Sequence, residues 1–585
     1  MAAREANSWL PVVCAAGTAF VTINYVVRVY VFPFIGRKLR GYLQQHSYAK
    51  FMSLREELCL DDPRATTSPN QTKNNQYLLT VLRKNENTEL GRELSFHSIE
   101  NAEQYREIVP LCSYCDILSK IERLCQGEQY LMSTEKLFYF GTSSGTTGKQ
   151  KMIPITSGSF SSMNLLASSA NGAAFYFLVN HTNYQFNNTH GSALFAYNAQ
   201  ENKKTACGIP YGPLSQAMRA IGGLPSLFFK VIFSVMNEIP LDITDKVEHF
   251  ETNLLLQGLF ALLSKDLVSI AFAFGSVLNH FFVLLRTHFT EMISCIEEGS
   301  LLSCKQFCQY IPRAVIDEIS EFLRSNYTLR YRTSRAQELR EIKSFDGVVA
   351  RIWPSILFAA TSVSGAFAMY ENNIRSYLGD VPLLGAVYLC SEGCIGFQYD
   401  RSGSYMFHPD AAFFEFIPED EIHEESPKTL LLSELQDNCR YEIVITTSSG
   451  FYRYRMGDVV EIVGRARFDV PLFTISYRTG SILDAYGEKT TETHVETALN
   501  EMAQLFQCRL ENFTSFLDIN TSPVVYMIFV EFDRQLSPDE QATLSSQFDE
   551  HLQQAHDVYA HCRKQEKIGP PQCRSYEPGV FQQFL

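Results

Sequence analysis

The sequence predicts an α/β protein with a large N-terminal domain and a small C-terminal domain. Three observations predict this fold class. Residues 130–200 alternate short apolar runs with turns rich in serine, glycine and asparagine, and residues 350–475 contain several strand-like runs. Residues 478–585 combine two helical patterns with a strand, which is typical of a separate α/β unit. A chain of 585 residues is also longer than one typical domain.

Residues 1–49 are predicted to be an apolar membrane anchor or signal segment with a basic flank. About 22 residues between Glu5 and Arg28 carry no charge, which is enough to span a bilayer as a helix. Small residues such as Ala15 and Ala16 leave a cleaved signal peptide as the alternative. We therefore expect localisation to the endoplasmic reticulum, with the nuclear envelope as a second candidate membrane.

The side of the membrane on which the chain lies is left open by two opposing signals. Basic residues follow the apolar run, and this favours a chain that faces the cytosol. Six N-x-Ser/Thr sequons favour a lumenal glycoprotein instead. The sequons are at Asn70, Asn180, Asn187, Asn326, Asn512 and Asn520.

Residues 50–477 form the predicted large domain, and residues 214–345 within it are expected to be mostly helical. The apolar run Leu254–Leu285 is predicted to be a buried helix pair, because Lys265 and Asp266 interrupt it as a membrane span. In the small domain, the expected elements are helix Glu492–Leu505, strand Val524–Phe532 and helix Pro538–Ala555. The net charge of −14 argues against a nucleic-acid partner, since phosphate contacts need a basic surface.

The most informative motif is a small-residue loop between two apolar segments. Glycines and small hydroxyl residues leave backbone N–H groups unshielded, so the loop can surround an anion, and its lysines add positive charge. It lacks the spacing of the usual nucleoside-triphosphate loop, so it is a different phosphate-binding motif. The loop reads Ser143, Ser144, Gly145, Thr146, Thr147, Gly148, Lys149, Gln150 and Lys151.

Two further motifs carry groups that suit a nucleotide. Tyr388 ends a predicted strand and can stack on a purine, while Ser391 and Glu392 follow with a hydroxyl for phosphate and a carboxylate for Mg²⁺. Asp458 comes directly after a glycine and can accept both ribose hydroxyls. Arg453 and Arg455 could pair carboxylates or phosphates in a bidentate manner.

Together, and in this order, the three motifs resemble the Gretchen-Hagen-three family of auxin-responsive acyl-acid amido synthetases. They stand here as Ser143–Lys151, Tyr388–Glu392 and Tyr454–Asp458. The resemblance extends over roughly residues 50–585, and the animal branch of the family is the nearer one because it shares an apolar leader. It implies the acyl-adenylate-forming fold, similar to firefly luciferase, with a mobile C-terminal domain.

The resemblance also implies a nucleotide site and a reaction. Ser143, Ser144, Gly145, Thr146, Thr147, Lys151 and Ser391 would contact the ATP phosphates. Tyr388 would stack on adenine, Glu392 would hold Mg²⁺ and Asp458 would bind ribose. The C-terminal domain would deliver a catalytic lysine, for which Lys567 is the candidate and Lys489 the alternative.

The implied function is an ATP-dependent ligase that adenylates a carboxylic acid and transfers the acyl group to an amine or amino acid. A thioester-forming ligase that uses coenzyme A is one alternative. A catalytically silent, membrane-tethered protein that keeps the nucleotide fold is another.

Overall fold

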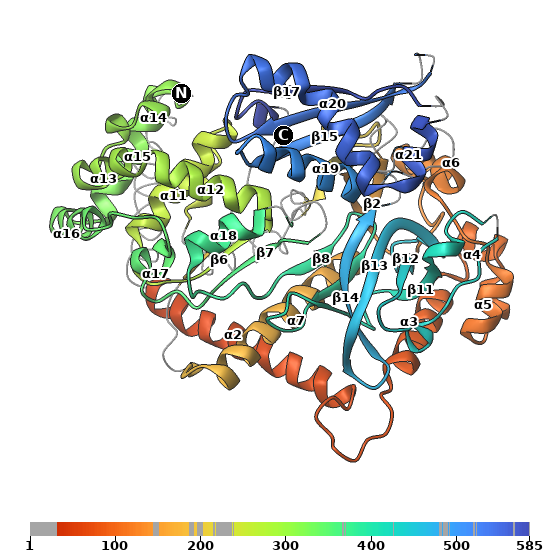
Figure 1. The fold of residues 1–585 in the computed structure, drawn as a ribbon. Helices are drawn as coiled ribbons and strands as arrows, with labels where there is room; N and C mark the ends of the chain where they lie inside the picture. The colour runs from red at the N-terminus through yellow and green to blue at the C-terminus, as the bar shows by residue number, and fades with distance from the viewer. Residues whose placement is uncertain are drawn as a thin grey trace, which may run out of the picture.

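The computed structural model arranges the chain as several sheets flanked by helices (Figure 1). A helical region lies at one side, the largest sheet at the other, and the C-terminal part above both. The structure describes residues 32–143, 151–186, 192–195, 203–214, 217, 237, 239–364, 368, 370–424, 426–478, 483, 490, 492–518, 521, 523–564 and 568–583.

The largest sheet has seven antiparallel strands in the order β11-β12-β13-β14-β10-β9-β8. Its inner face is apolar because buried aromatic and β-branched residues recur along each strand. In sequence order the strands are β8 (Val387–Leu389), β9 (Cys394–Gln398), β10 (Tyr405–Phe407), β11 (Phe413–Pro418), β12 (Arg440–Thr446), β13 (Tyr454–Arg467) and β14 (Val470–Arg478).

Two smaller sheets belong to the same large domain. One has the order β2-β1-β5-β4, with β1 (Leu137–Ser143), β2 (Lys151–Thr156), β4 (Lys203–Lys204) and β5 (Pro210–Pro213). The other is parallel, in the order β3-β6-β7, with β3 (Ser192–Phe195), β6 (Leu267–Phe274) and β7 (Phe358–Ser362).

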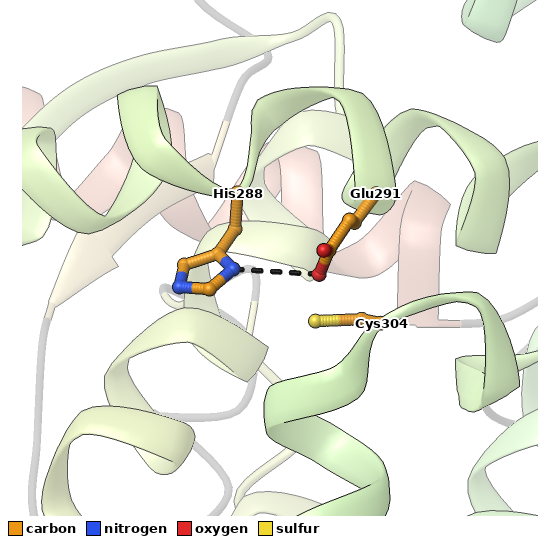
Figure 2. A group of neighbouring side chains, drawn as sticks. All are labelled: His288, Glu291 and Cys304. Atoms are coloured by element: carbon orange, nitrogen blue, oxygen red, sulfur yellow. Dashed lines mark hydrogen bonds and ion pairs between the residues drawn. The ribbon is translucent and has the colours of Figure 1, made fainter.

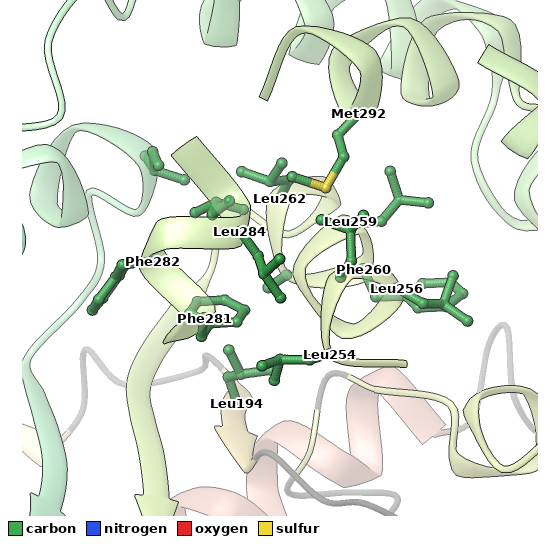
Figure 3. Close-up of a cluster of buried hydrophobic side chains, with 14 of the residues drawn as sticks. Leu194, Leu254, Leu256, Leu259, Phe260, Leu262, Phe281, Phe282, Leu284 and Met292 are labelled. Carbon is green, nitrogen blue, oxygen red and sulfur yellow. The ribbon is translucent and has the colours of Figure 1, made fainter. Parts of the chain in front are cut away.

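The helical region has its own apolar core, in which side chains of α11 and α12 interdigitate with one another (Figure 3). Trp353 is fully buried in this core, and its indole N–H donates to the carbonyl of Ala261 at 2.7 Å. The helices are α10 (Leu241–Thr244), α11 (Phe250–Leu263), α12 (Gly275–Thr287), α13 (Phe289–Glu298), α14 (Lys305–Tyr310), α15 (Arg313–Asn326), α16 (Leu329–Arg340), α17 (Val348–Ile352) and α18 (Glu371–Leu378).

The expected helix pair over Leu254–Leu285 is wrong in one respect. Two helices are present, but strand β6 lies between them. Lys265 and Asp266 end the first helical segment, and the uniformly apolar run that follows has no periodicity that separates a buried strand from a buried helix. Among the described residues, no helix is both long and apolar enough to cross a membrane.

The C-terminal part is a sheet of order β15-β16-β17 packed against helices around a separate apolar core. The strands are β15 (Leu510–Asp518), β16 (Val525–Phe532) and β17 (Gln572–Tyr576). The helices are α19 (Glu492–Leu505), α20 (Pro538–Ala555) and α21 (Asp557–Lys564). The two predicted helices agree with α19 and α20, and Ser537 caps α20 by accepting a hydrogen bond from the Glu540 N–H.

The remaining helices cover the sheets of the large domain, and the longest two of them, α2 and α7, pack closely together. A Cβ added at Gly172 of α7 would lie 2.4 Å from both the Phe51 Cβ and the Ser47 carbonyl oxygen of α2. These helices are α2 (Phe32–Glu57), α3 (Asn70–Asn85), α4 (Glu89–Glu93), α5 (Ala102–Ile108), α6 (Tyr114–Cys125) and α7 (Ser157–His181).

We expect Gly172→Ala to lower the free energy of unfolding by about 1–3 kcal/mol, because the added methyl group overpacks a backbone contact. Gly41→Ala in α2 is the matched control, since nothing lies within 4 Å of a Cβ there. That change should stabilise the helix by about 0.5–1 kcal/mol. Urea denaturation of both variants measures the difference, and equal midpoints would contradict the close approach.

Candidate functional site

The phosphate-loop motif lies between two paired strands, as the apolar flanks predicted. Strand β1 ends at Ser143 and β2 begins at Lys151, and these two residues are antiparallel partners. The side chains of Tyr139 and Phe140 before the loop are buried, as are those of Ile153 and Ile155 after it. The hairpin therefore holds both ends of the loop on a rigid base.

Most of the loop itself lies outside the described residues, and so do both candidate lysines. The residues concerned are Ser144, Gly145, Thr146, Thr147, Lys489 and Lys567. The backbone of Ser143 is described but its side chain is not. The roles assigned to these residues stay predictions.

The second motif forms a tight turn at the end of the edge strand β8. The Cys390 N–H donates to the Gly393 carbonyl at 3.1 Å, which closes the turn that carries Ser391 and Glu392. A Cβ at Gly393 would lie 3.0 Å from the Ile445 side chain of β12, so only glycine fits there without a shift. Glu392 is 3% exposed, and the turn therefore presents a carboxylate within a largely buried setting.

The structure joins the second and third motifs directly. The hydroxyl of Tyr388 donates to Asp458 Oδ2 at 2.7 Å, across 70 residues of sequence, and both residues are buried. Three strands separate β8 from β13 in the sheet, which would be about 19 Å if the sheet were flat. The sheet must therefore curl so that its edge turn approaches β13.

The ring of Tyr388 is held by aromatic neighbours on the same face of this curled sheet. Its centroid lies 6.3 Å from that of Tyr405 and 6.0 Å from that of Phe473. With its hydroxyl bonded to Asp458, the ring is fixed at both ends. Only 8% of Tyr388 is exposed in this conformation, so its stacking on adenine stays a prediction.

Asp458 is positioned by the local backbone and by a buried carboxylate. Gly457 has φ +78°, a conformation that favours glycine, and its N–H donates to Glu442 Oε1 at 3.2 Å. Arg455 donates from Nε to the same carboxylate at 3.2 Å. Glu442 therefore ties together Arg455 and Gly457, two of the three residues that precede Asp458, and the sequence carried no signal for this role.

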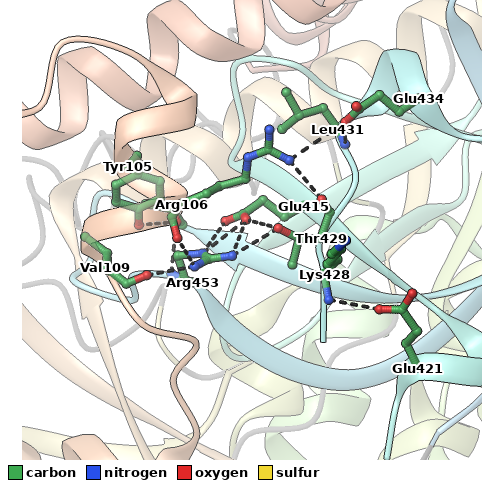
Figure 4. A network of polar contacts seen from close by, with 11 residues as sticks. Tyr105, Arg106, Val109, Glu415, Glu421, Lys428, Thr429, Leu431, Glu434 and Arg453 are labelled. Carbon is green, nitrogen blue, oxygen red and sulfur yellow. Dashed lines mark hydrogen bonds and ion pairs between the residues drawn. The ribbon is translucent and has the colours of Figure 1, made fainter. Parts of the chain in front are cut away.

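Arg453 pairs with a carboxylate of the protein, in a network shown in Figure 4. Its guanidinium donates to Glu415 at 2.9–3.1 Å, to Thr429 at 3.0 Å, and to the carbonyls of Arg106 and Val109 at 2.8 and 2.7 Å. Of the two partners proposed from the sequence, carboxylate or phosphate, both arginines use the carboxylate. They support the strand that carries Asp458.

Tyr114 of α6 contacts the hairpin at the exit of the phosphate loop. Its hydroxyl accepts a hydrogen bond from the Met152 N–H at 2.9 Å, and Lys151 Nζ lies 5.3 Å from the centre of its ring. Burial raises the pKa of Tyr114, and the nearby carboxylate of Glu392 contributes to the same increase. Tyr114 therefore anchors the exit of the phosphate loop, where β2 begins.

Family models match three consecutive parts of the chain. Residues 63–383 match the GH3 family N-terminal domain, residues 405–478 the GH3 family central domain, and residues 493–585 the GH3 family C-terminal domain.

The chain belongs to the GH3 family.

Relatives within this family include plant ligases. The GH3 chain is 25% identical over 530 residues to indole-3-acetic acid-amido synthetase GH3.3 of Arabidopsis thaliana, which covers 86% of this chain and 84% of the relative. It is 27% identical over 544 residues to jasmonoyl–L-amino acid synthetase GH3.5 of Oryza sativa subsp. japonica. That alignment covers 87% of this chain and 88% of the relative.

A solved structure shares the fold. AtGH3.15 acyl acid amido synthetase in complex with 2,4-DB matches with a TM-score of 0.71 at 23% identity, covering 91% of this chain and 90% of the other. The predicted α/β fold class is confirmed as the mixed α/β GH3 fold with N-terminal, central and C-terminal domains. The domain limits drawn at residues 49 and 477 stay predictions.

Proposed function

We propose that this GH3 protein is an ATP-dependent acyl-acid amido synthetase. The observation that carries the proposal is the hydrogen bond between Tyr388 and Asp458, because it joins two motifs of the nucleotide site through buried groups. A structural role would also explain a buried tyrosine–aspartate pair, but it would not require the buried carboxylate of Glu392 in the turn that follows Tyr388. The family membership of the whole chain supports the same function.

Asp458 is suited to binding the ribose of ATP. A carboxylate offers about four acceptor sites on its two oxygens, so the bond from Tyr388 leaves room for two ribose hydroxyls. The loop from Ser143 to Lys151, together with Ser391, would bind the phosphates through N–H and hydroxyl groups.

The donor set at the second motif suits Mg²⁺. Glu392 offers a hard carboxylate oxygen, and Mg²⁺ in ATP sites is held by one or two carboxylates together with substrate phosphates. Glu392 is therefore the residue that would hold the ion. When bound, the ion would neutralise negative charge on the ATP phosphates.

The proposed reaction has two steps. In the first, a carboxylate oxygen of the acid attacks the α-phosphorus of ATP, and pyrophosphate leaves. In the second, an amine nitrogen attacks the acyl carbon, loses a proton, and AMP leaves with the ribose held at Asp458. This chain contributes mainly orientation and charge stabilisation, with Lys567 or Lys489 as the candidate lysine from the C-terminal domain.

The test is acid-dependent exchange of radiolabelled pyrophosphate into ATP by the purified protein, with pooled carboxylic acids as substrates. We expect exchange that requires both the acid and Mg²⁺, followed by formation of an amide and AMP when amino acids are added. Product formation only with coenzyme A would identify a thioester ligase instead. ATP binding without exchange or product would identify the catalytically silent alternative.

We further propose that the protein belongs to the animal branch of the family and lies at the endoplasmic reticulum membrane, facing the cytosol. The support is the uncharged stretch before Arg28, which lies outside the described residues. Asn70 is only 1% exposed, whereas Asn180 and Asn326 are exposed at helix ends. Mass detection of glycans at those two asparagines would contradict the cytosolic orientation.

A further inference from the structure

Three side chains of metal-binding type converge in the helical region, apart from the three nucleotide motifs (Figure 2). His288, Glu291 and Cys304 each offer one ligand atom, and these atoms all lie within 4.8 Å of one another. His288 Nδ1 is 3.4 Å from Glu291 Oε2. Among the described residues, these three side chains form the one cluster that could hold a metal ion.

The backbone fixes all three positions. His288 lies at the junction of two helices: its N–H donates to the Leu284 carbonyl of α12 at 2.9 Å, and its carbonyl accepts from Met292 of α13 at 2.9 Å. Glu291 follows three residues later, which places both side chains on one face of the helix. Cys304 is held before α14 by the hydrogen bond from its N–H to the Leu301 carbonyl at 3.2 Å.

The three side chains differ in their access to solvent. Cys304 is fully buried, so its sulfur lies on the interior side of the cluster. The side chains of His288 and Glu291 are 21% and 36% exposed, so an ion has a path from solvent. The cluster therefore has one buried side chain, Cys304, and two side chains that solvent reaches.

The donor atoms decide the type of metal. Imidazole nitrogen, thiolate sulfur and carboxylate oxygen are the three ligand types of Zn²⁺, and a three-residue site takes water as its fourth ligand. Tetrahedral zinc needs ligand atoms about 3.3–3.8 Å apart, given its bond lengths. Atoms that already lie within 4.8 Å reach this spacing by small side-chain rotations.

We propose that His288, Glu291 and Cys304 bind one zinc ion, which ties the start of α13 to the turn before α14. The site is independent of the nucleotide site and of the proposed ligase reaction. Its ligands are separated by 2 and 12 residues in sequence, which differs from the usual cysteine and histidine spacings of zinc motifs, so the sequence did not reveal it. Bound zinc should raise the thermal midpoint of the protein because it binds only the folded site.

The experiment compares zinc binding by the full-length, metal-stripped protein and by its variants. A weak chelator is present, and it removes zinc that is bound only by a single exposed cysteine. We expect wild type to bind one more equivalent of Zn²⁺ than Cys304→Ser or Glu291→Gln. Affinity at this site should fall by at least about 100-fold, the upper end of the effect of losing an outer-shell partner. Cys308→Ser is the matched control, because Cys308 is exposed on α14, the short helix that directly follows Cys304; it should bind like wild type.

Cobalt substitution supplies a readout that does not depend on a folded variant. Wild type with Co²⁺ should show a thiolate-to-cobalt charge-transfer band in the near ultraviolet, and Cys308→Ser should retain it. Absence of the band in wild type, or equal zinc stoichiometry in wild type and Cys304→Ser, would overturn the proposal. Circular dichroism confirms that the compared variants are folded.

Discussion

Asp458→Ala is expected to reduce acid-dependent pyrophosphate exchange by at least about 100-fold. Two hydrogen bonds from ribose hydroxyls to a charged group would be lost, each contributing about 1.5–3 kcal/mol. Glu392→Ala should give a loss of similar size, with a raised Mg²⁺ requirement, because the proposed metal ligand is removed. Exchange rates at varied ATP and Mg²⁺ concentrations separate the two effects.

Two further variants test the assigned site: Tyr388→Phe probes the bond to Asp458, and Asp437→Ala is the control. The first keeps the ring but removes the hydroxyl that donates to Asp458, so it should raise the KM for ATP by about tenfold with less effect on kcat. The second removes an exposed carboxylate paired with Arg465, and should leave exchange unchanged. If Asp458→Ala and Glu392→Ala kept the ATP affinity and rate of wild type, the assigned nucleotide site would be wrong.

Arg453→Met is expected to lower the free energy of unfolding by about 3–5 kcal/mol, the cost of leaving one partner of a buried ion pair uncompensated. Glu415 is 1% exposed and would lose the guanidinium that contacts both of its oxygens. Arg453 also has φ +47°, so the turn depends on these contacts to hold it. Urea denaturation followed by circular dichroism measures the loss.

Arg440→Met is the matched control for this prediction. Arg440 lies on the neighbouring strand β12 and pairs with Glu461, but its side chain is 46% exposed, so its loss should cost less than about 1 kcal/mol. The double variant Arg453→Met with Glu415→Leu should cost less than the sum of the two single changes, because no buried charge remains unpaired. Equal costs for Arg453→Met and Arg440→Met would contradict the role of the network.

Local patterns in the sequence were sufficient for several elements of the structure. Helices α19 and α20 were predicted with the observed ends, because an amphipathic period is a property of neighbouring residues. The loop between β1 and β2 was predicted from apolar flanks for the same reason. Strand β6 was missed because an apolar run that is buried on all sides loses its period.

The bonding groups that each motif carries followed from residue identity alone, because glycines, hydroxyls and carboxylates have the same bonding capacity in any fold. The family resemblance implied how those groups would be used. The distances between the motifs in space did not follow from the sequence. Curling of the seven-stranded sheet brings Tyr388 to Asp458, and the packing of helices brings Cys304 to His288. Such contacts depend on how remote segments pack against one another, and no spacing along the chain encodes that arrangement.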